Sequence, residues 1–408
     1  MFRRVTRRAR IVALAGVLAA SAVVTTAGAP VAAADGPGAG SPWVVSLGDS
    51  AISGEAGRWA GNTNNGSDLI DAGGANAYWD NAGRTAEAIP GCHRSESAAI
   101  HIGTVSSLNL ACSGAKTYTS GGGSSDFKPG IDFANTAYGK GQALSLQEFA
   151  STHNVKMVAV MIGANDYGFA DILQACHVNW LTSPSWWKNY CYDDSSVSSR
   201  FTSSNITAKT AAIRGAFLNV QQAMTNAGYS ASQYTIVAHT YWSPVPNGAG
   251  NRYPESGWTR QSIGGCGMWN RDADYANSTI VPAFNTSVKN AAAQTGLSNI
   301  KVLDLQSSLN GRRLCENTVG LLEEKGVASW TSAGAVDKTE WVNQLRVAST
   351  VVGPYQVQES VHANHWGQMA MRNCMRQAYN GGAPRGGNCV RSANGLNGSG
   401  EPNMTLQP

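Results

Sequence analysis

The sequence lacks several patterns that would each indicate a different class of protein. After the N-terminal segment, no stretch approaches the roughly 20 apolar residues that a membrane-spanning helix needs. Lys and Arg do not cluster there as they do in proteins that bind a phosphate backbone, so nucleic-acid binding has no support. The chain also contains no Cys-x-x-Cys pair, no internal repeat and no heptad run. It contains no Gly-x-Ser-x-Gly pentapeptide either, and this absence argues against an α/β-hydrolase nucleophile elbow.

The N-terminal segment has the pattern of an export signal. Five arginines lie within the first ten residues, an apolar run follows from Ile11 to about Val24, and Ala32-Ala33-Ala34 precede Asp35. This order predicts a signal peptide over residues 1–34, cleaved after Ala34, and a secreted, extracellular protein. Because the signal contains five arginines and no acidic residue, its removal changes the formal net charge from +4 to −1.

The cysteines support the same compartment. All eight lie after the predicted signal. An even number in an exported chain favours disulfides over metal binding or redox chemistry.

Five short apolar runs predict β-strands, with helical patterns between them. The runs cover residues 43–47, 108–112, 157–162, 234–239 and 300–305. Alternating strands and helices predict a three-layer α/β/α sandwich around a mainly parallel five-stranded sheet.

Three helical patterns are clear between the strands. One covers residues 206–224 and ends at Gly228, and a shorter one covers residues 143–149. The third covers residues 272–295, and we expect Pro282 to kink or interrupt it.

The most informative segment is the one that leaves the first strand. There the apolar run ends at Gly48-Asp49-Ser50, which presents a serine hydroxyl just beyond the strand. Ligands of such sheets bind beyond the carboxyl ends of the strands, where the strand order reverses. Asn165 follows the third predicted strand, so Ser50 and Asn165 are both expected at a cleft.

Four short blocks in a fixed order resemble the SGNH (GDSL) hydrolases. They contain Ser50, then Gly114 in Ala-Cys-Ser-Gly-Ala, Asn165 in Gly-Ala-Asn-Asp, and His362 in Glu-Ser-Val-His-Ala-Asn. The resemblance implies that Ser50 is a nucleophile activated by His362. It also implies an oxyanion hole made by the backbone amides of Ser50 and Gly114 and the side-chain amide of Asn165.

The choice of histidine rests on this resemblance. His365 is the main rival to His362, and His239 ends a strand and could border the cleft. His362 and His365 have the spacing of a helical metal pair, but no third ligand stands out. We therefore expect no metal and no cofactor.

The sequence does not decide which group orients the imidazole of His362. The family's usual aspartate is replaced by Glu359, which is the candidate third member of the catalytic set. The alternative is the backbone carbonyl of Ser360, which would stabilise the imidazolium with a dipole instead of a full charge.

Three polar residues close to Ser50 in the sequence also have expected roles. Asp49 is expected to be structural and to fix the nucleophile loop by local hydrogen bonds. Glu55 and Arg58 either line the site or pair with each other.

The resemblance also predicts the organisation of the chain. It fits one catalytic domain over residues 35–380, enlarged by insertions. For the tail over 381–408, the composition itself, rich in Gly, Asn and Pro, predicts partial disorder. The insertions are expected at about 56–100, 168–204, 242–271 and 310–358. Local disulfides in sequential order fit the family: Cys92–Cys112, Cys176–Cys191, Cys266–Cys315 and Cys374–Cys389.

The expected substrate is an acyl ester, with lipid or phospholipid esters preferred. The chain resembles secreted actinobacterial members of the family, which include lipases and phospholipases A. Trp180, Trp186, Trp187 and Tyr190 crowd one segment between two cysteines and could contact a lipid surface transiently. They could equally pack on the protein's own core or stack on sugars. A carbohydrate acetyl esterase and a non-catalytic lipid- or glycan-binding protein therefore remain alternatives, and we expect a monomer.

Overall fold

The computed structural model describes residues 36–346 and 357–408, so the predicted signal at 1–34 lies outside the described residues. Its centre is a seven-stranded sheet in the order β2-β1-β5-β6-β7-β8-β9. The strands are β1 (Pro42–Gly48), β2 (Ser106–Asn109), β5 (Asn154–Met161), β6 (Thr235–His239), β7 (Ile300–Asp304), β8 (Gly387–Leu396) and β9 (Pro402–Gln407). All neighbouring pairs are parallel except β8 and β9.

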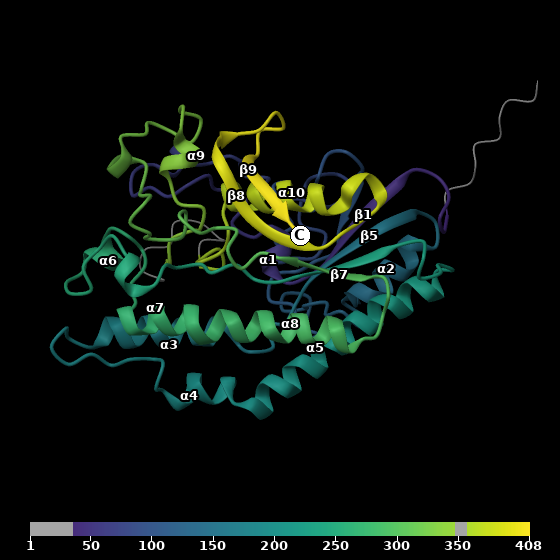
Figure 1. Cartoon of the computed structure of the whole chain (residues 1–408), viewed down its shortest axis with the longest axis horizontal. Helices are drawn as coiled ribbons and strands as arrows, with labels where there is room; N and C mark the ends of the chain where they lie inside the picture. The colour runs from purple at the N-terminus through teal and green to yellow at the C-terminus, as the bar shows by residue number, and fades with distance from the viewer. Residues whose placement is uncertain (1–35, 347–356) are drawn as a thin grey trace, which may run out of the picture. The chain divides into compact units, whose positions relative to one another are not determined.

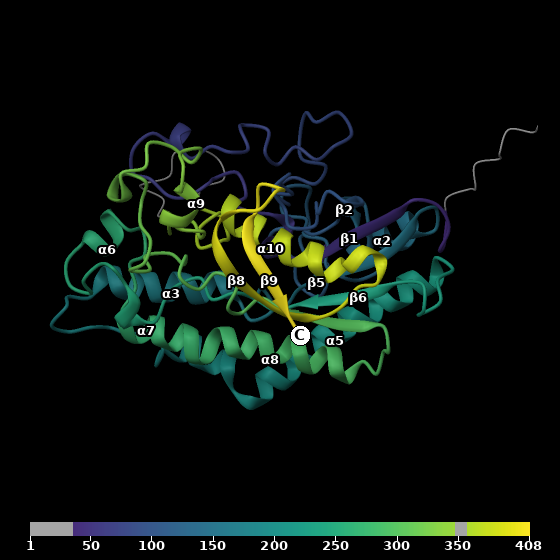
Figure 2. The same cartoon turned by 45° about the horizontal axis from the view of Figure 1, so that its top comes forward.

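Helices cover both faces of the sheet, which confirms the three-layer α/β/α architecture. Figures 1 and 2 show α10 (His365–Tyr379) on one face and α5 (Ser203–Asn226) with α8 (Val281–Gln294) on the other. The middle strands are apolar along their length because both faces are covered, and Val44, Val45 and Leu47 of β1 are fully buried. None of the described helices is long and apolar enough to cross a membrane.

The five predicted strands and the predicted helices are confirmed, with shifts of a few residues at their ends. The helix predicted over 143–149 is α2 (Gln142–Ala150), and the one predicted over 206–224 is α5. The pattern over 272–295 becomes α7 (Asn270–Tyr275), a π-helical turn η4 (Ala276–Ile280) and α8. Pro282 lies in the first turn of α8 and has no N–H for a regular α-helical hydrogen bond, and the wider turn lies just before it.

The tail over 381–408, predicted to be partly disordered, instead contributes two strands to the sheet. β8 pairs in parallel with β7, and β9 returns antiparallel to β8, so the sheet has seven strands instead of five. The Gly- and Asn-rich composition concealed an alternating pattern in β9, where Pro402, Met404 and Leu406 are buried and the residues between them are not.

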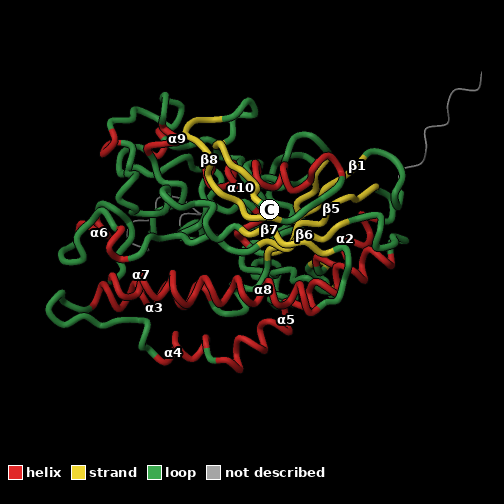
Figure 3. Tube along the Cα trace, in the orientation of Figure 1, coloured by secondary structure: helices red, strands yellow, loops and turns green. Residues whose placement is uncertain are grey.

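The segments predicted as insertions contain long loops and short helices. Figure 3 shows such loops around α6 (Thr259–Ser262) and α9 (Ala335–Lys338). The segment over 168–204 contains α3 (Phe169–Thr182) and α4 (Ser195–Ser198). All four sequential disulfides are confirmed, and the bridge between Cys176 and Cys191 ties α3 to the loop before α4.

Candidate active site

The turn after β1 places Ser50 at the start of the short helix α1 (Ser50–Ser53). Gly48 has a φ of 139°, and a Cβ there would lie 1.9 Å from the carbonyl oxygen of Met161, so the turn accepts only glycine. Asp49 caps α1 because its Oδ1 accepts a hydrogen bond from the Ala51 amide at 3.1 Å. This local bond is the structural role expected for Asp49.

His362 contacts the Ser50 hydroxyl directly. Its Nε2 lies 2.7 Å from Ser50 Oγ, and its Nδ1 lies 3.1 Å from the carbonyl oxygen of Ser360. A carbonyl can only accept, so Nδ1 carries the proton and Nε2 is left to accept the hydrogen of Ser50. The chain thus brings together a hydroxyl and a base that are 312 residues apart.

The backbone around His362 explains how the Ser360 carbonyl reaches the ring. Val361 has a φ of 63°, a conformation that a β-branched residue rarely adopts. Asn343 holds this turn from outside: its amide donates to the His362 carbonyl at 2.9 Å, and its carbonyl accepts from Val361 at 3.2 Å. The strained turn directs the Ser360 carbonyl back toward Nδ1.

Glu359 does not take the place expected for it beside His362. Its carboxylate accepts hydrogen bonds from Trp59 Nε1 at 2.7 Å and from the hydroxyl of Tyr78. Burial raises the pKa of Glu359, against these two hydrogen bonds. Of the two alternatives left open by the sequence, the carbonyl of Ser360 therefore contacts Nδ1. The spacing of three residues between Glu359 and His362 could not reveal this partner, because the direction of the Glu359 side chain depends on the strained turn at Val361.

The rival histidines lie away from Ser50 Oγ. Nδ1 of His365 pairs with Ser97 Oγ at 3.0 Å, and burial, helped by the charge of Arg372, lowers its pKa to about 4. His239 is fully buried, which lowers its pKa to about 3. Within the described ranges, no cluster of three or more His, Cys, Asp or Glu could hold a metal ion.

The expected oxyanion donors come from three adjacent strands. Gly114 follows β2, Ser50 follows β1 and Asn165 follows β5, and these strands are neighbours in the order β2-β1-β5. In the described part of the chain, the amides of Ser50 and Gly114 donate no hydrogen bond to another protein group. Asn165 Nδ2 donates one hydrogen to the Ala115 carbonyl at 3.0 Å, which leaves its second hydrogen for a ligand.

A tyrosine that the sequence did not single out connects two of these turns. The hydroxyl of Tyr241 donates to Asp49 Oδ2 and accepts from the Ala164 amide at 3.1 Å. Burial raises the pKa of Asp49 to about 7, although the hydrogen bond from Tyr241 acts in the opposite direction. Tyr241 therefore couples the turn of Ser50 to the turn of Asn165.

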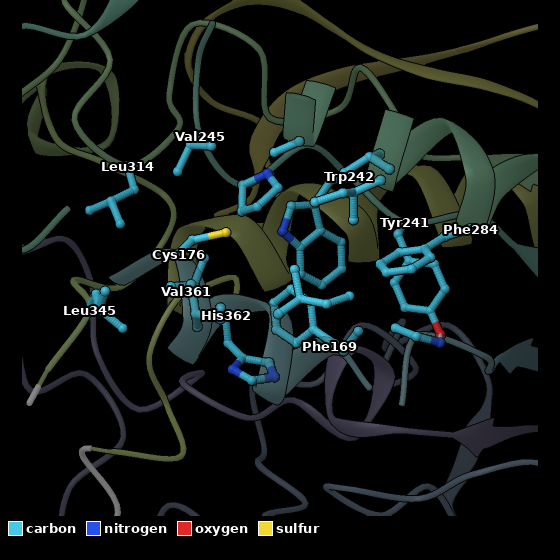
Figure 4. Close-up of a pocket in the computed structure, with 18 of the residues that line it drawn as sticks. Phe169, Cys176, Tyr241, Trp242, Val245, Phe284, Leu314, Leu345, Val361 and His362 are labelled. Atoms are coloured by element: carbon cyan, nitrogen blue, oxygen red, sulfur yellow. Dashed lines mark hydrogen bonds between the residues drawn. The ribbon is translucent and has the colours of Figure 1, made fainter. Parts of the chain in front are cut away.

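An apolar pocket opens next to Ser50 and His362 (Figure 4). It encloses about 1020 Å³, counting the space at its open mouth. Its walls come from α3, the segment after β6, η4 and α8, and the predicted insertions. The apolar residues around it include Phe169, Ile172, Leu173, Trp242, Val245, Met268, Ile280, Phe284, Leu314 and Leu345.

Glu55 and Arg58 do not pair with each other. Arg58 makes two hydrogen bonds to Asp71, at 3.0 and 2.6 Å. Glu55 instead lies beside His362 and pairs with His93 Nδ1 at 2.9 Å. Neither of these partners was expected from the sequence.

The tryptophan-rich segment divides into a buried and an exposed part. Trp180 is only 5 % exposed and packs against Trp258 and Trp269. Trp186 and Trp187 are 82 % and 74 % exposed. Packing on the protein's own core thus holds for Trp180, whereas Trp186 and Trp187 are exposed.

Comparisons with known proteins found weak similarity to solved lipase structures. No family model and no curated protein matches the chain. An extracellular lipase from Streptomyces rimosus is 18 % identical over 82 % of this chain and 98 % of its own, with a TM-score of 0.43. Phospholipase A1 from Streptomyces albidoflavus NA297 is 17 % identical over 84 % of this chain and 100 % of its own, with a TM-score of 0.44. The lipase Lip_vut3 from a goat rumen metagenome is 12 % identical over 84 % of this chain and 98 % of its own, with a TM-score of 0.33.

Proposed function

We propose that this chain is a secreted serine esterase that hydrolyses acyl esters of lipids. The observation that carries the proposal is the 2.7 Å contact between Ser50 Oγ and His362 Nε2 beside an apolar pocket. Four disulfides and the predicted signal peptide support export.

The proposed reaction follows from the proton positions. Nε2 of His362 takes the hydroxyl proton while Ser50 Oγ bonds to the ester carbonyl carbon. The oxyanion accepts hydrogen bonds from the amides of Ser50 and Gly114 and from Asn165. The imidazolium returns its proton to the leaving alcohol as the C–O bond breaks. A water molecule deprotonated by the same histidine then bonds to the acyl carbon, and the proton passes to Ser50 Oγ as the acid leaves.

The pocket favours a long acyl group over an acetyl group. Its lining is almost entirely aliphatic and aromatic, and Phe169, Ile172, Leu173 and Cys176 extend it along one side of α3. These four residues cover about 10 Å of helix at 1.5 Å per residue. An acetyl group would leave most of this surface in contact with water, whereas an acyl chain would bury it.

The direct test is hydrolysis of p-nitrophenyl esters from acetate to palmitate by the mature protein. We expect an optimum at medium or long chains, with Ser50→Ala as the blank. An optimum confined to acetate would favour carbohydrate deacetylation instead. If a fluorophosphonate probe failed to label Ser50 and no ester were turned over, the chain would be a binding protein.

We further propose that Trp186 and Trp187 contact the lipid surface that supplies the substrate. Both are mostly exposed, and they follow α3, whose other end reaches the pocket. Replacing both with alanine should lower activity on micellar or vesicle substrate several-fold and leave activity on a soluble ester unchanged. Tyr138→Ala, which removes a half-exposed ring from the loop between β3 (Asn135–Thr136) and β4 (Gly139–Lys140), is the matched control. Equal losses on soluble and aggregated substrate would contradict the surface role.

A further inference from the structure

A buried carboxylate lies next to the Ser50–His362 pair and has no part in the mechanism above. Oε2 of Glu55 is 3.8 Å from His362 Nε2, and Glu55 is fully buried. The left-handed turn at Gly54, with a φ of 92°, brings Glu55 back from the end of α1. A Cβ at Gly54 would lie 2.3 Å from Ser95 Oγ, so this turn too requires glycine.

Two side chains hold the Glu55 carboxylate in place. Oε1 lies 2.9 Å from His93 Nδ1, and Oε2 accepts a hydrogen bond from the hydroxyl of Ser113. His93 and Ser113 each follow a cysteine of the Cys92–Cys112 disulfide. The Ser113 amide also donates to the Cys92 carbonyl at 3.0 Å. The disulfide thus joins the two segments that fix Glu55.

The surroundings of Glu55 keep it ionised. Burial acts to raise its pKa, but His362 and the hydrogen bonds from His93 and Ser113 lower the pKa below its usual value. Burial acts to lower the pKa of His93, but the hydrogen bond and the charge of Glu55 raise it.

Other charged and titratable groups face this pair from further away. The charge of Glu87 raises the pKa of His93, and the charge of Lys128 lowers it. Burial lowers the pKa of Lys128, against the charges of Glu55 and Glu87. Asp49, Tyr78 and Glu359 also lie within electrostatic reach of Glu55.

We propose that Glu55 is a positioning residue. It supplies, on the Nε2 side of His362, the negative charge that is missing on the Nδ1 side. Nδ1 faces a carbonyl dipole, so no carboxylate stabilises the imidazolium from there. The Glu55 carboxylate lies on the Nε2 side, where the proton of Ser50 arrives, and at 3.8 Å it is beyond hydrogen-bonding distance. It therefore acts by its charge and takes up no proton itself. This inference rests on the proposed ester hydrolysis.

The test is the pH dependence of Glu55→Gln, which removes the charge and keeps the shape. We expect kcat to fall roughly 10- to 100-fold, with KM within about twofold, because the charge matters only once the imidazolium forms. The acid limb of kcat/KM should move to lower pH, because an imidazolium without its neighbouring carboxylate gives up its proton more readily.

Glu401→Gln is the matched control. It removes a buried carboxylate just before β9 that pairs with Arg376 of α10. It should lower the melting temperature and leave the acid limb in place. If Glu55→Gln also lowered the melting temperature and rate without moving the acid limb, Glu55 would be merely structural and the proposal would be wrong.

Glu55→Asp provides the same test if the glutamine variant does not fold. It keeps the charge but withdraws it by one methylene, so the acid limb should move part of the way. An aspartate variant that lost rate and stability while its acid limb stayed in place would overturn the proposal. If the unmodified protein showed no Ser50-dependent turnover, the proposed function itself would have failed, and this outcome is distinct from an unmoved acid limb.

Discussion

Replacing either Ser50 or His362 with alanine should abolish ester hydrolysis, with a loss in kcat on the order of 10⁴- to 10⁶-fold for each variant. In the proposed mechanism Ser50 Oγ forms the bond to the substrate and His362 Nε2, 2.7 Å away, takes its proton, so either deletion removes the same step. The measurement is single-turnover and steady-state hydrolysis of the preferred p-nitrophenyl ester. Thermal unfolding of each variant checks that the fold is intact.

The double variant makes this prediction sharper. Because the two side chains act as one unit, Ser50→Ala/His362→Ala should be about as slow as the worse single variant. His365→Ala is the control histidine, since His365 pairs with Ser97 Oγ rather than with Ser50. A variant of His362 that retained a tenth of the activity would rule out this residue as the general base.

Replacing Asn165 with alanine should lower kcat about 10²- to 10³-fold and change KM little. Loss of one oxyanion donor typically raises the barrier by about 2.7 to 4 kcal/mol, and the donor acts mainly on the charge that develops in the transition state. Asn165 lies beside Ser50 in the pocket, and only one of its amide hydrogens is used by Ala115.

Asn219→Ala is the matched control for the lost amide. Asn219 lies on α5, and its Nδ2 donates to the Ile131 carbonyl at 2.8 Å, away from the pocket. This variant should lose some stability and keep its rate. Equal effects of the two substitutions on kcat would contradict the role of Asn165 as an oxyanion donor.

Short-range features of the fold could be predicted well. The strand β1 is an apolar run broken only by Ser46 because it is buried on both faces, and such a run is visible in the sequence alone. The π-helical turn before Pro282 follows from the missing amide hydrogen of one residue. The strands of the tail were not predicted because its glycines and asparagines suggest disorder, while the edge of β7 that pairs with β8 lies more than 80 residues earlier in the chain.

The candidate site, too, could be predicted from the sequence only in part. The order of Ser50, Gly114, Asn165 and His362 could be recognised in the sequence, and parallel strands bring the ends of β2, β1 and β5 to one edge of the sheet. The partner of His362 Nδ1 could not be recognised, because the strained backbone at Val361 decides whether Glu359 or the Ser360 carbonyl faces the ring.

The sequence by itself determined which residues carry the chemical groups: a hydroxyl after a buried strand, an imidazole, an amide, and eight cysteines that pair in order. The tertiary structure decided which charges surround them. Glu55 lies near His362 only because the turn at Gly54 and the Cys92–Cys112 disulfide hold it there, and Tyr241 joins two turns from a third strand. Electrostatic interactions depend on distance in space and on burial, and neither is fixed by the distance along the chain.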